Sequence, residues 1–347
     1  MRPLCHLYKK SASSAGTTCA TSSQINSKQR QRGAALLMAM LTVTLVATLA
    51  AASLWQQWRS VEVEAAERQR VQSGWILTGA LDWARLILRE DARSGGADHL
   101  AEPWAVPLQE SRLSTFLAAD RNNTGGATSE EQVDAFLSGQ ITDMQSRLNL
   151  FNLVQDNQIS PVALAAFTRL FTLLNLPPLE LNRMAEQLQL ALDSSKYNST
   201  DASIPLMPRS AAQLGWLGLS PATVAALQPY VSVLPVRTAV NLNTASAEVL
   251  VASVPNLNMA EAQKLVSARA SKYFRSTADA SAILNQPSIT FSESEHGVAT
   301  RYFEVLGRLR LGPSMLQERS LVQRDGIIVT TVWRERVAAD PPPAAAP

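Results

Sequence analysis

The chain has 347 residues, with 31 lysines and arginines, 29 aspartates and glutamates, and two cysteines. Both cysteines, Cys5 and Cys19, precede residue 34, so the remaining chain contains neither a disulfide nor a cysteine-type zinc site. Residues 1–33 hold six basic residues and no acidic one, which leaves 25 basic against 29 acidic residues beyond them. Because phosphate neutralisation dominates the binding of nucleic acid, this mildly acidic balance argues against nucleic acid as a partner.

An apolar stretch without charge follows the basic start. It runs from Ala34 to Leu54 (AALLMAMLTVTLVATLAAASL), and about 20 apolar residues in a helix suffice to cross a bilayer. Trp55 and Trp58 come next, where aromatic side chains are typical of the membrane interface. Since lysine and arginine beside a span hold that side in the cytoplasm, we expect one inner-membrane span with the C-terminal part in the periplasm.

Gly33 stands directly before the apolar stretch. An ordinary secretory signal has a shorter apolar region with its cleavage site behind it. A cut between Gly33 and Ala34 would instead leave the apolar segment on the mature protein. This order of parts resembles prepilin signals, which a dedicated prepilin peptidase cuts after the glycine. The alternative is an uncleaved signal anchor in which the glycine occurs by chance.

The helix is predicted to continue beyond the membrane through residues 55–93. There is no proline between Gln56 and Arg93, and apolar residues recur at spacings of three and four between Ile76 and Leu88. Such a stripe indicates a helix that packs one face on a globular domain. Ser94-Gly95-Gly96 should end it.

Beyond this helix we expect the first part of a sheet domain at 94–154, with 97–130 as loop and a helix or strand within 131–154. A block of helices is predicted over 155–290. Its expected helices open at Ser160-Pro161, cover Leu179 to Leu192, open at Ser220-Pro221, and are capped by Thr244 and by Asn258, the last running to Arg269.

The period changes to two in residues 291–337, which are predicted as the last strands of the sheet. Val298 to Leu311 alternates, and Ser320 to Trp333 has the form of a hairpin with Asp325-Gly326 as its two-residue turn. The tail 338–347 is predicted to be disordered. A helical block ahead of the last strands indicates an α+β fold with an all-helical insertion in an antiparallel sheet domain.

Several runs together resemble the type II secretion minor pseudopilin K family (general secretion pathway protein K). They are the junction from Arg32 to Leu37, DMQSRLNLFNL at 143–153, AVNLNTASAEVLVASVP at 239–255, and YFEVLGRLRLG at 302–312 with LVQRDGIIVTTVWRER at 321–336. The resemblance implies a pilin-like domain with a large helical insertion. It also implies a non-enzymatic place at the tip of the periplasmic pseudopilus, in complex with minor pseudopilins I and J. A minor pilin of a type IV pilus is a related alternative.

Met38 is the fifth residue counted from Ala34. Most pilins and pseudopilins are known for a glutamate at this place, and protein K is known for lacking it. A carboxylate within the bilayer is costly unless it meets a partner, and in a filament the partner is the α-amine of the adjoining subunit. A subunit with no neighbour above it can dispense with that carboxylate. The simpler interpretation is that Met38 is one more apolar residue of a span.

Residues 243–269 resemble a helix-hairpin-helix, with Asn256 and Asn258 in the places where DNA-binding examples have glycine. Asparagine tolerates left-handed backbone but hinders the approach of phosphate, so we expect protein packing. The alternative from another class is a signal-anchored periplasmic module that grips DNA, as in DNA uptake.

The resemblance also implies a calcium loop, but only Asp193 matches it clearly and Asp201 is an uncertain second ligand. Because calcium takes six to eight oxygen ligands, we expect a weak site or none, and no other cofactor. His99 and His296 stand in polar surroundings, and no nucleophile or phosphate-binding motif accompanies them. We therefore expect no enzyme activity and no small-molecule substrate.

Overall fold

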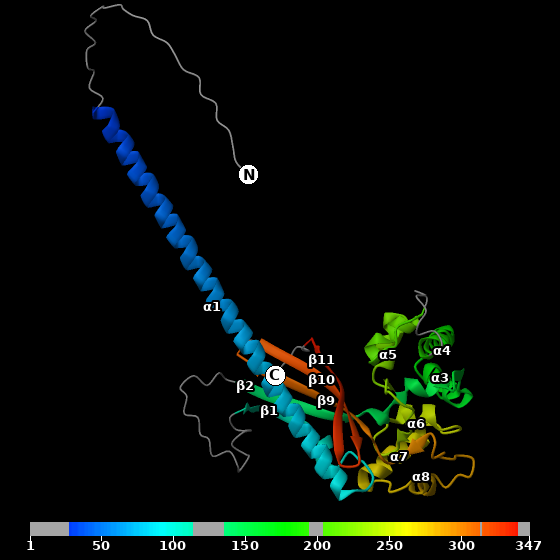
Figure 1. Cartoon of the computed structure of the whole chain (residues 1–347). Helices are drawn as coiled ribbons and strands as arrows, with labels where there is room; N and C mark the ends of the chain where they lie inside the picture. Colours follow the sequence, from blue (N-terminus) through cyan, green and yellow to red (C-terminus); the bar gives the residue numbers. More distant parts are fainter. Residues whose placement is uncertain (1–27, 114–134, 194–203, 313, 339–347) are drawn as a thin grey trace, which may run out of the picture. The chain divides into compact units, whose positions relative to one another are not determined.

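The computed structural model of the chain describes residues 28–113, 135–193, 204–312 and 314–338 (Figure 1). Asp201, the predicted leader up to residue 27, and the predicted tail from residue 339 lie outside these ranges. The chain forms two compact units that divide between Gln69 and Arg70. Helix α1 (Lys28–Ser94) contributes to both, and each unit is described by itself.

The first unit consists of the N-terminal part of α1. Its apolar segment is the one helix among the described residues that is long and apolar enough to cross a membrane, and none of that segment is buried by protein. Thr42, Thr44 and Thr48 donate their hydroxyl hydrogens to carbonyls three residues earlier, at 2.8–3.0 Å. These bonds satisfy the polar groups within the helix itself, as a lipid environment requires.

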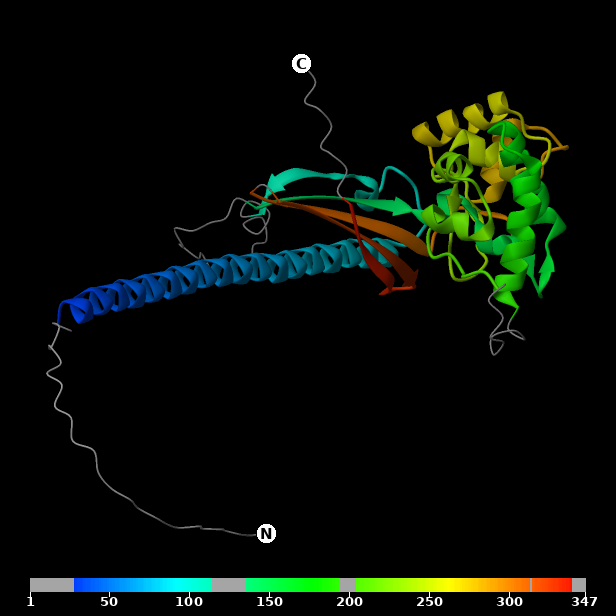
Figure 2. The ribbon, with the colours of Figure 1, turned by 90° about the horizontal axis from the view of Figure 1, so that it is seen from above.

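In the second unit α1 runs along one face of a five-stranded antiparallel sheet of order β1-β2-β9-β10-β11 (Figures 1 and 2). The strands are β1 (Leu108–Arg112), β2 (Ala135–Asp143), β9 (Tyr302–Leu311), β10 (Ser314–Asp325) and β11 (Ile328–Val337). The predicted stripe packs as expected: Leu81, Ala84 and Leu88 form a core with Phe303 and Val305.

Leu77 packs nearer the start of this helical segment, with Leu309 and Leu311 of β9. Gly307 permits its close approach, since a Cβ there would lie 3.3 Å from Leu77 Cδ2. Trp104, in the 3₁₀ turn η1 (Pro103–Ala105), closes the other end of the core edge-on to Phe303. The α+β class predicted from the sequence is confirmed.

The chain leaves the sheet after Asp143 and returns to it at Tyr302, so residues 144–301 are inserted between the adjacent strands β2 and β9. The insertion contains α3 (Pro161–Leu173), α4 (Pro178–Leu192), α5 (Pro221–Leu227), α6 (Ala247–Ser253), α7 (Met259–Ser271) and α8 (Thr277–Leu284). It also contains the turns η2 (Met144–Ser146), η3 (Leu150–Leu153) and η5 (Ala211–Leu217), and the two-residue strands β3 (Leu148–Asn149), β4 (Val154–Gln155), β5 (Gln158–Ile159), β6 (Val231–Ser232), β7 (Val240–Asn241) and β8 (His296–Gly297).

The insertion has its own core, drawn from residues between Leu148 and Ile289. Leu148 and Leu150 belong to this core, although the sequence assigned 94–154 to the sheet domain. The structural change from sheet to insertion therefore comes directly after Asp143. The two-residue strands also mean that the insertion is mostly, not entirely, helical.

Three predicted helix starts are confirmed. Ser160 and Ser220 cap α3 and α5 through their hydroxyls, and Asn258 forms a capping box with Glu261 at the start of α7. The prediction of Thr244 as a cap is wrong. Ser246 caps α6, because the Thr244 hydroxyl is bonded to Asp143 at 2.5 Å.

The last hairpin differs from its prediction by one residue. Asp325 pairs with Ile328, so the two-residue loop is Gly326-Ile327 and not Asp325-Gly326. Gly326 has φ +55°, which glycine adopts without steric cost.

Two elements differ from their prediction. β1 lies within the region predicted as loop, and α8 was not predicted.

Three hairpins of the insertion share one local pattern: a residue in left-handed conformation, then leucine, then the N-cap of the next helix. The left-handed residues are Asn175 (φ +54°), Gly218 (φ +88°) and Asn256 (φ +62°). Leu176, Leu219 and Leu257 follow them and pack on the helical core. Asn258 is extended, with φ −93°, so of the two asparagines predicted in glycine-like places only Asn256 has the conformation that favours glycine.

Candidate functional site: the junction of the sheet and the inserted helices

The predicted membrane and processing residues lie on exposed helix in the first unit. Gly33, Ala34 and Met38 are all part of α1, and the Met38 side chain is exposed. A Cβ added at Gly33 would meet no atom within 4 Å, so packing does not explain the glycine. Cleavage between Gly33 and Ala34 remains a prediction.

Two of the motifs on which the family resemblance rests, 143–153 and 239–255, meet in the second unit. Asp143, fully buried at the end of β2, accepts four hydrogen bonds. Oδ1 accepts from the Gln145 N–H at 2.7 Å. Oδ2 accepts from Asn241 Nδ2 at 3.0 Å, Thr244 Oγ1 at 2.5 Å and Thr300 Oγ1 at 2.7 Å. One carboxylate thus joins the sheet to the inserted segment at three places in the chain.

Further amides of the first motif bind the main chain of residues 236–239, which lead into the second motif. Gln145 donates to the Ala239 carbonyl at 3.0 Å, and Asn149 donates to the Val236 carbonyl at 2.7 Å. Asn152 donates to the Thr238 carbonyl at 2.8 Å and accepts from the Thr238 N–H at 3.1 Å. These polar residues explain the motif: each satisfies buried backbone groups of a loop.

Arg324 of β10 extends this network to the end of α1. Its guanidinium donates to Asp91 at 2.6 Å, to the carboxylate of Asp98, and to the Thr300 carbonyl at 2.8 Å, and it lies over the Phe303 ring. Asp98 in turn accepts from the Thr300 N–H at 2.6 Å. We call the set Asp91, Asp98, Asp143, Asn241, Thr244, Thr300 and Arg324 the junction network.

Burial dominates the electrostatics of these acids. Desolvation raises the pKa of Asp143, opposed by the hydrogen bonds from Thr244 and Thr300. Desolvation also raises the pKa of Asp98, opposed by the charge of Arg324. The pKa of Glu102 rises to about 7, first through burial, and the charges of Asp91 and Asp98 add to the rise.

Asp91, Asp98 and Glu102 bring carboxylate oxygens within 4.8 Å of one another, a spacing that could hold a metal ion. Protein donors already occupy them. Arg324 binds Asp91 and Asp98, and Glu102 Oε2 accepts from the His99 N–H and from Trp104 Nε1. We therefore interpret Asp91 and Asp98 as the charge partners of Arg324, and Glu102 as the hydrogen-bond acceptor of His99 and Trp104.

The calcium loop is not tested by the structure. Asp193 is the C-cap of α4, and Asp201 lies outside the described residues, so the predicted pair cannot be brought together here. The expectation of a weak calcium site or none remains a prediction. His99 stacks on Tyr273 with ring centroids 3.9 Å apart, and His296 lies edge-on to Phe291, so both histidines take part in packing.

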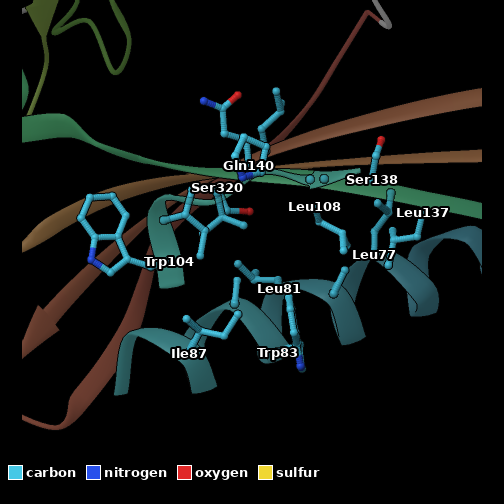
Figure 3. Close-up of a pocket in the computed structure, with 18 of the residues that line it drawn as sticks. Leu77, Leu81, Trp83, Ile87, Trp104, Leu108, Leu137, Ser138, Gln140 and Ser320 are labelled. Carbon is cyan, nitrogen blue, oxygen red and sulfur yellow. The ribbon is translucent and has the colours of Figure 1, made fainter. Parts of the chain in front are cut away.

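An apolar pocket of about 250 Å³ lies between α1 and the β1–β2 side of the sheet (Figure 3). Leu77, Leu81 and Ile87 line it from the helix, and Leu108 and Leu137 from the strands. The exposed edge of the pocket includes Trp83.

Comparison with known proteins identifies the family. The family described as Type II secretion system (T2SS), protein K matches residues 146–236 and 240–299. The Type II secretion system protein K of Klebsiella pneumoniae is 30% identical over 342 residues, covering 88% of this chain and 96% of that protein. The chain belongs to the type II secretion system protein K family.

Other members agree. The protein K of Pseudomonas aeruginosa is 27% identical over 323 residues, covering 86% of this chain and 90% of the relative. That of Pectobacterium carotovorum subsp. carotovorum is 26% identical over 337 residues, covering 89% and 97%. The crystal structure of the GspK-GspI-GspJ complex from enterotoxigenic Escherichia coli has the same fold, with a TM-score of 0.57 at 19% identity over 79% of this chain and 99% of that chain.

The sequence found the motifs of this protein K family member but missed the site they build. Asp143, the 239–255 run and Arg324 within the 321–336 run were noted as parts of family signatures without a role, and Asp98 and Thr300 were not singled out. Two signals were available. One is an aspartate at the end of an apolar strand, and the other is asparagines around a leucine. In both places a polar residue stands where a buried segment would be expected to have an apolar one.

Proposed function

We propose that this chain is a minor pseudopilin that caps the tip of the periplasmic pseudopilus of a type II secretion system and so supports export across the outer membrane. The observation that carries the proposal is the insertion 144–301 between adjacent strands β2 and β9 of a sheet packed on a long N-terminal helix. A helical block of this size cannot be buried between stacked pilin-sized subunits, so it belongs at the end of the filament.

The N-terminal helix is the proposed membrane anchor of the chain before assembly. We propose that prepilin peptidase cuts between Gly33 and Ala34, and that the span Ala34 to Leu54 then holds the chain in the inner membrane with residues from Trp55 onward in the periplasm. The basic residues ahead of the span support this orientation. Met38 supports a terminal position, since a subunit without a neighbour above has no amine for a carboxylate to bind.

Assembly needs no catalytic group, which agrees with a structural role in the family. Minor pseudopilins I and J are the proposed partners, because the related GspK of Escherichia coli is found in a complex with GspI and GspJ. The exposed face of α1, with Val71 and Trp75 outside the membrane segment, offers these partners apolar area.

Co-purification tests the proposal. The full chain is co-expressed with minor pseudopilins I and J, and the membranes are then solubilised in detergent. On purification the chain should elute with both partners as one stable assembly. The major pseudopilin serves as a control and should not replace either partner. Elution of this chain alone, under conditions where I and J associate with each other, would contradict the proposal.

The processing site has its own test. With prepilin peptidase present, mass spectrometry should find an N-terminus at Ala34, and Gly33→Leu should block the cut while Ala39→Leu in the span should not. An intact leader in a functioning secretion system would show that the chain is a plain signal anchor. Retention of the processed protein on a DNA column at moderate salt would favour the DNA-uptake alternative instead.

A further inference from the structure

The sheet and the insertion have separate hydrophobic cores. The α1–sheet core and the core of the insertion share no residue. Across the boundary the described residues form one small apolar cluster, in which Leu234 and Met144 of the insertion lie with Tyr302 and Leu321 and Trp333 packs at its edge, and one ring stack, of His99 on Tyr273. So little apolar area does not define a unique orientation, because hydrophobic contact is non-directional.

Directional contacts are instead concentrated at this boundary. Asn241 Nδ2 donates to the Asp98 carbonyl at 3.1 Å, to Asp143 at 3.0 Å and to Thr300 Oγ1 at 3.1 Å, while its Oδ1 accepts from the Asn243 N–H at 2.9 Å. Every polar atom of this side chain is used. Buried polar groups whose partners come from different segments are satisfied in one relative arrangement only.

Asp143 is the centre of this arrangement. It stands where the chain leaves the sheet, and its Oδ2 contacts residues from the insertion (Asn241, Thr244) and from the point of return to the sheet (Thr300). Through Thr300, Asp98 and Arg324 the network reaches Asp91 in the last turn of α1. A continuous set of buried hydrogen bonds therefore connects the stalk helix to the inserted helices.

We propose that Asp143 is a positioning residue that locks the inserted helices in one orientation on the sheet, so that the tip of the pseudopilus is rigid with respect to its stalk helix. The proposal rests on the proposed tip function. Without the lock, the insertion would remain folded around its own core and would turn about the two chain connections at 143–147 and 298–302. The exposed face of α1, which is the surface proposed to bind pseudopilins I and J, would be unchanged.

Asp143→Asn tests this with little change in volume. An amide presents one acceptor oxygen. The substituted side chain therefore cannot accept from Gln145 N–H on one side and from Asn241, Thr244 and Thr300 on the other. Thr244→Val, which removes one hydroxyl and keeps the shape, should produce a smaller effect of the same kind and serves if Asp143→Asn fails to fold. Leu250→Ala, deep in the core of the insertion, is the matched control that destabilises without touching the junction.

Distances between spin labels give the readout. In the full chain in detergent, with Cys5 and Cys19 replaced by serine, Thr330→Cys on β11 and Glu186→Cys on α4 report the orientation of the insertion. Glu186→Cys with Ser281→Cys on α8 reports its internal structure. All three label sites are exposed.

We expect one narrow Thr330–Glu186 distribution in the parent chain. Asp143→Asn should broaden it, Thr244→Val should broaden it less, and Leu250→Ala should leave it narrow. The Glu186–Ser281 distribution should stay narrow in the junction variants. Secretion by Asp143→Asn should fall while its assembly with pseudopilins I and J is retained.

A Thr330–Glu186 distribution that stays narrow in both junction variants would overturn the proposal. So would a Leu250→Ala variant that broadens as much as Asp143→Asn at equal loss of stability, since the effect would then be general loosening. These failures leave assembly with pseudopilins I and J intact. Loss of that assembly in the parent chain would instead defeat the proposed function itself.

Discussion

Arg324 and Asp91 are joined by a hydrogen-bonded ion pair of 2.6 Å between Nη1 and Oδ2, and both side chains are about nine-tenths buried. The pair connects the last turns of α1 to β10, which lies 233 residues further along the chain. Arg324 also holds Asp98, whose side chain is 4% exposed. Removing the guanidinium would therefore leave two desolvated carboxylates without a counter-charge.

Arg324→Met is expected to destabilise the protein strongly. Breaking a buried pair by removing one partner costs about 3–5 kcal/mol, because the remaining charge stays buried. The measurement is the free energy of unfolding from urea titration of the full chain in detergent. Arg89→Met is the control, since Arg89 and Glu90 form a half-exposed pair at 3.8 Å, and such a change should stay within about 0.5 kcal/mol. Equal losses in the two variants would show that the junction network contributes nothing special.

Glu102 should make the protein less stable as the pH rises. Its pKa in the folded protein is about 7, raised by burial from 4.5. The folded state therefore favours the proton, and the stabilisation is complete below pH 4.5 and is lost as the pH rises through 7. By linkage the loss amounts to about 3 kcal/mol at most.

Glu102→Gln should remove this dependence, because an amide oxygen can still accept from the His99 N–H and from Trp104 Nε1. The difference in unfolding free energy between the Glu102→Gln variant and the parent should grow steadily from pH 4.5 to 7.5. A constant difference over that range would mean that Glu102 titrates at its ordinary pKa.

Local rules predicted much of the fold. The α1 stripe, the caps Ser160, Ser220 and Asn258, and the alternation of β9 each depend on neighbours within a few residues, and all were confirmed. Thr244 shows where such rules fail. Its sequence context suits a helix cap, but a buried carboxylate 101 residues earlier takes its hydroxyl. Long-range polar partners of this kind leave no local pattern.

The junction network was hidden for the same reason. Asp98, Thr300 and Arg324 stand in different segments, and only the topology brings them together at the end of α1. The short edge strand β1 was missed because a strand of five residues with two prolines shortly before it resembles loop. The family motifs located the site, while its chemistry required the fold.

Gly79, within α1, and Gly95, directly after its last residue, should respond in opposite ways to substitution by alanine. Gly95 follows the last helical residue with φ +65°, where a Cβ is strained although no neighbouring atom lies within 4 Å. Gly95→Ala should lower the unfolding free energy by about 1 kcal/mol. Gly79 has helical backbone, is exposed and is equally free of neighbours, so Gly79→Ala should raise the free energy by about 0.5–1 kcal/mol. A loss in both variants would indicate that Gly79 also serves a contact.

His296 should make the protein less stable in acid. The ring is buried, and neither nitrogen has a hydrogen-bond partner among the described residues. Burial lowers its pKa from 6.5 to about 4, opposed by the nearby main chain of Ser292 and Ser253. Because the folded state favours the neutral ring, its stabilisation is complete above pH 6.5 and is lost as the pH falls through 4.

This dependence has the opposite sign to that of Glu102 over nearly the same pH interval, so the parent chain should show a flatter pH profile than either variant. His296→Leu keeps the ring site filled and cannot titrate. It should remove a loss of up to about 3 kcal/mol between pH 6.5 and 4, measured by urea titration at each pH. His99→Asn serves for comparison, since burial also lowers the pKa of that ring but the ring is partly exposed. A parent and a His296→Leu profile that run parallel down to pH 4 would show that the ring is protonated without cost in the folded state.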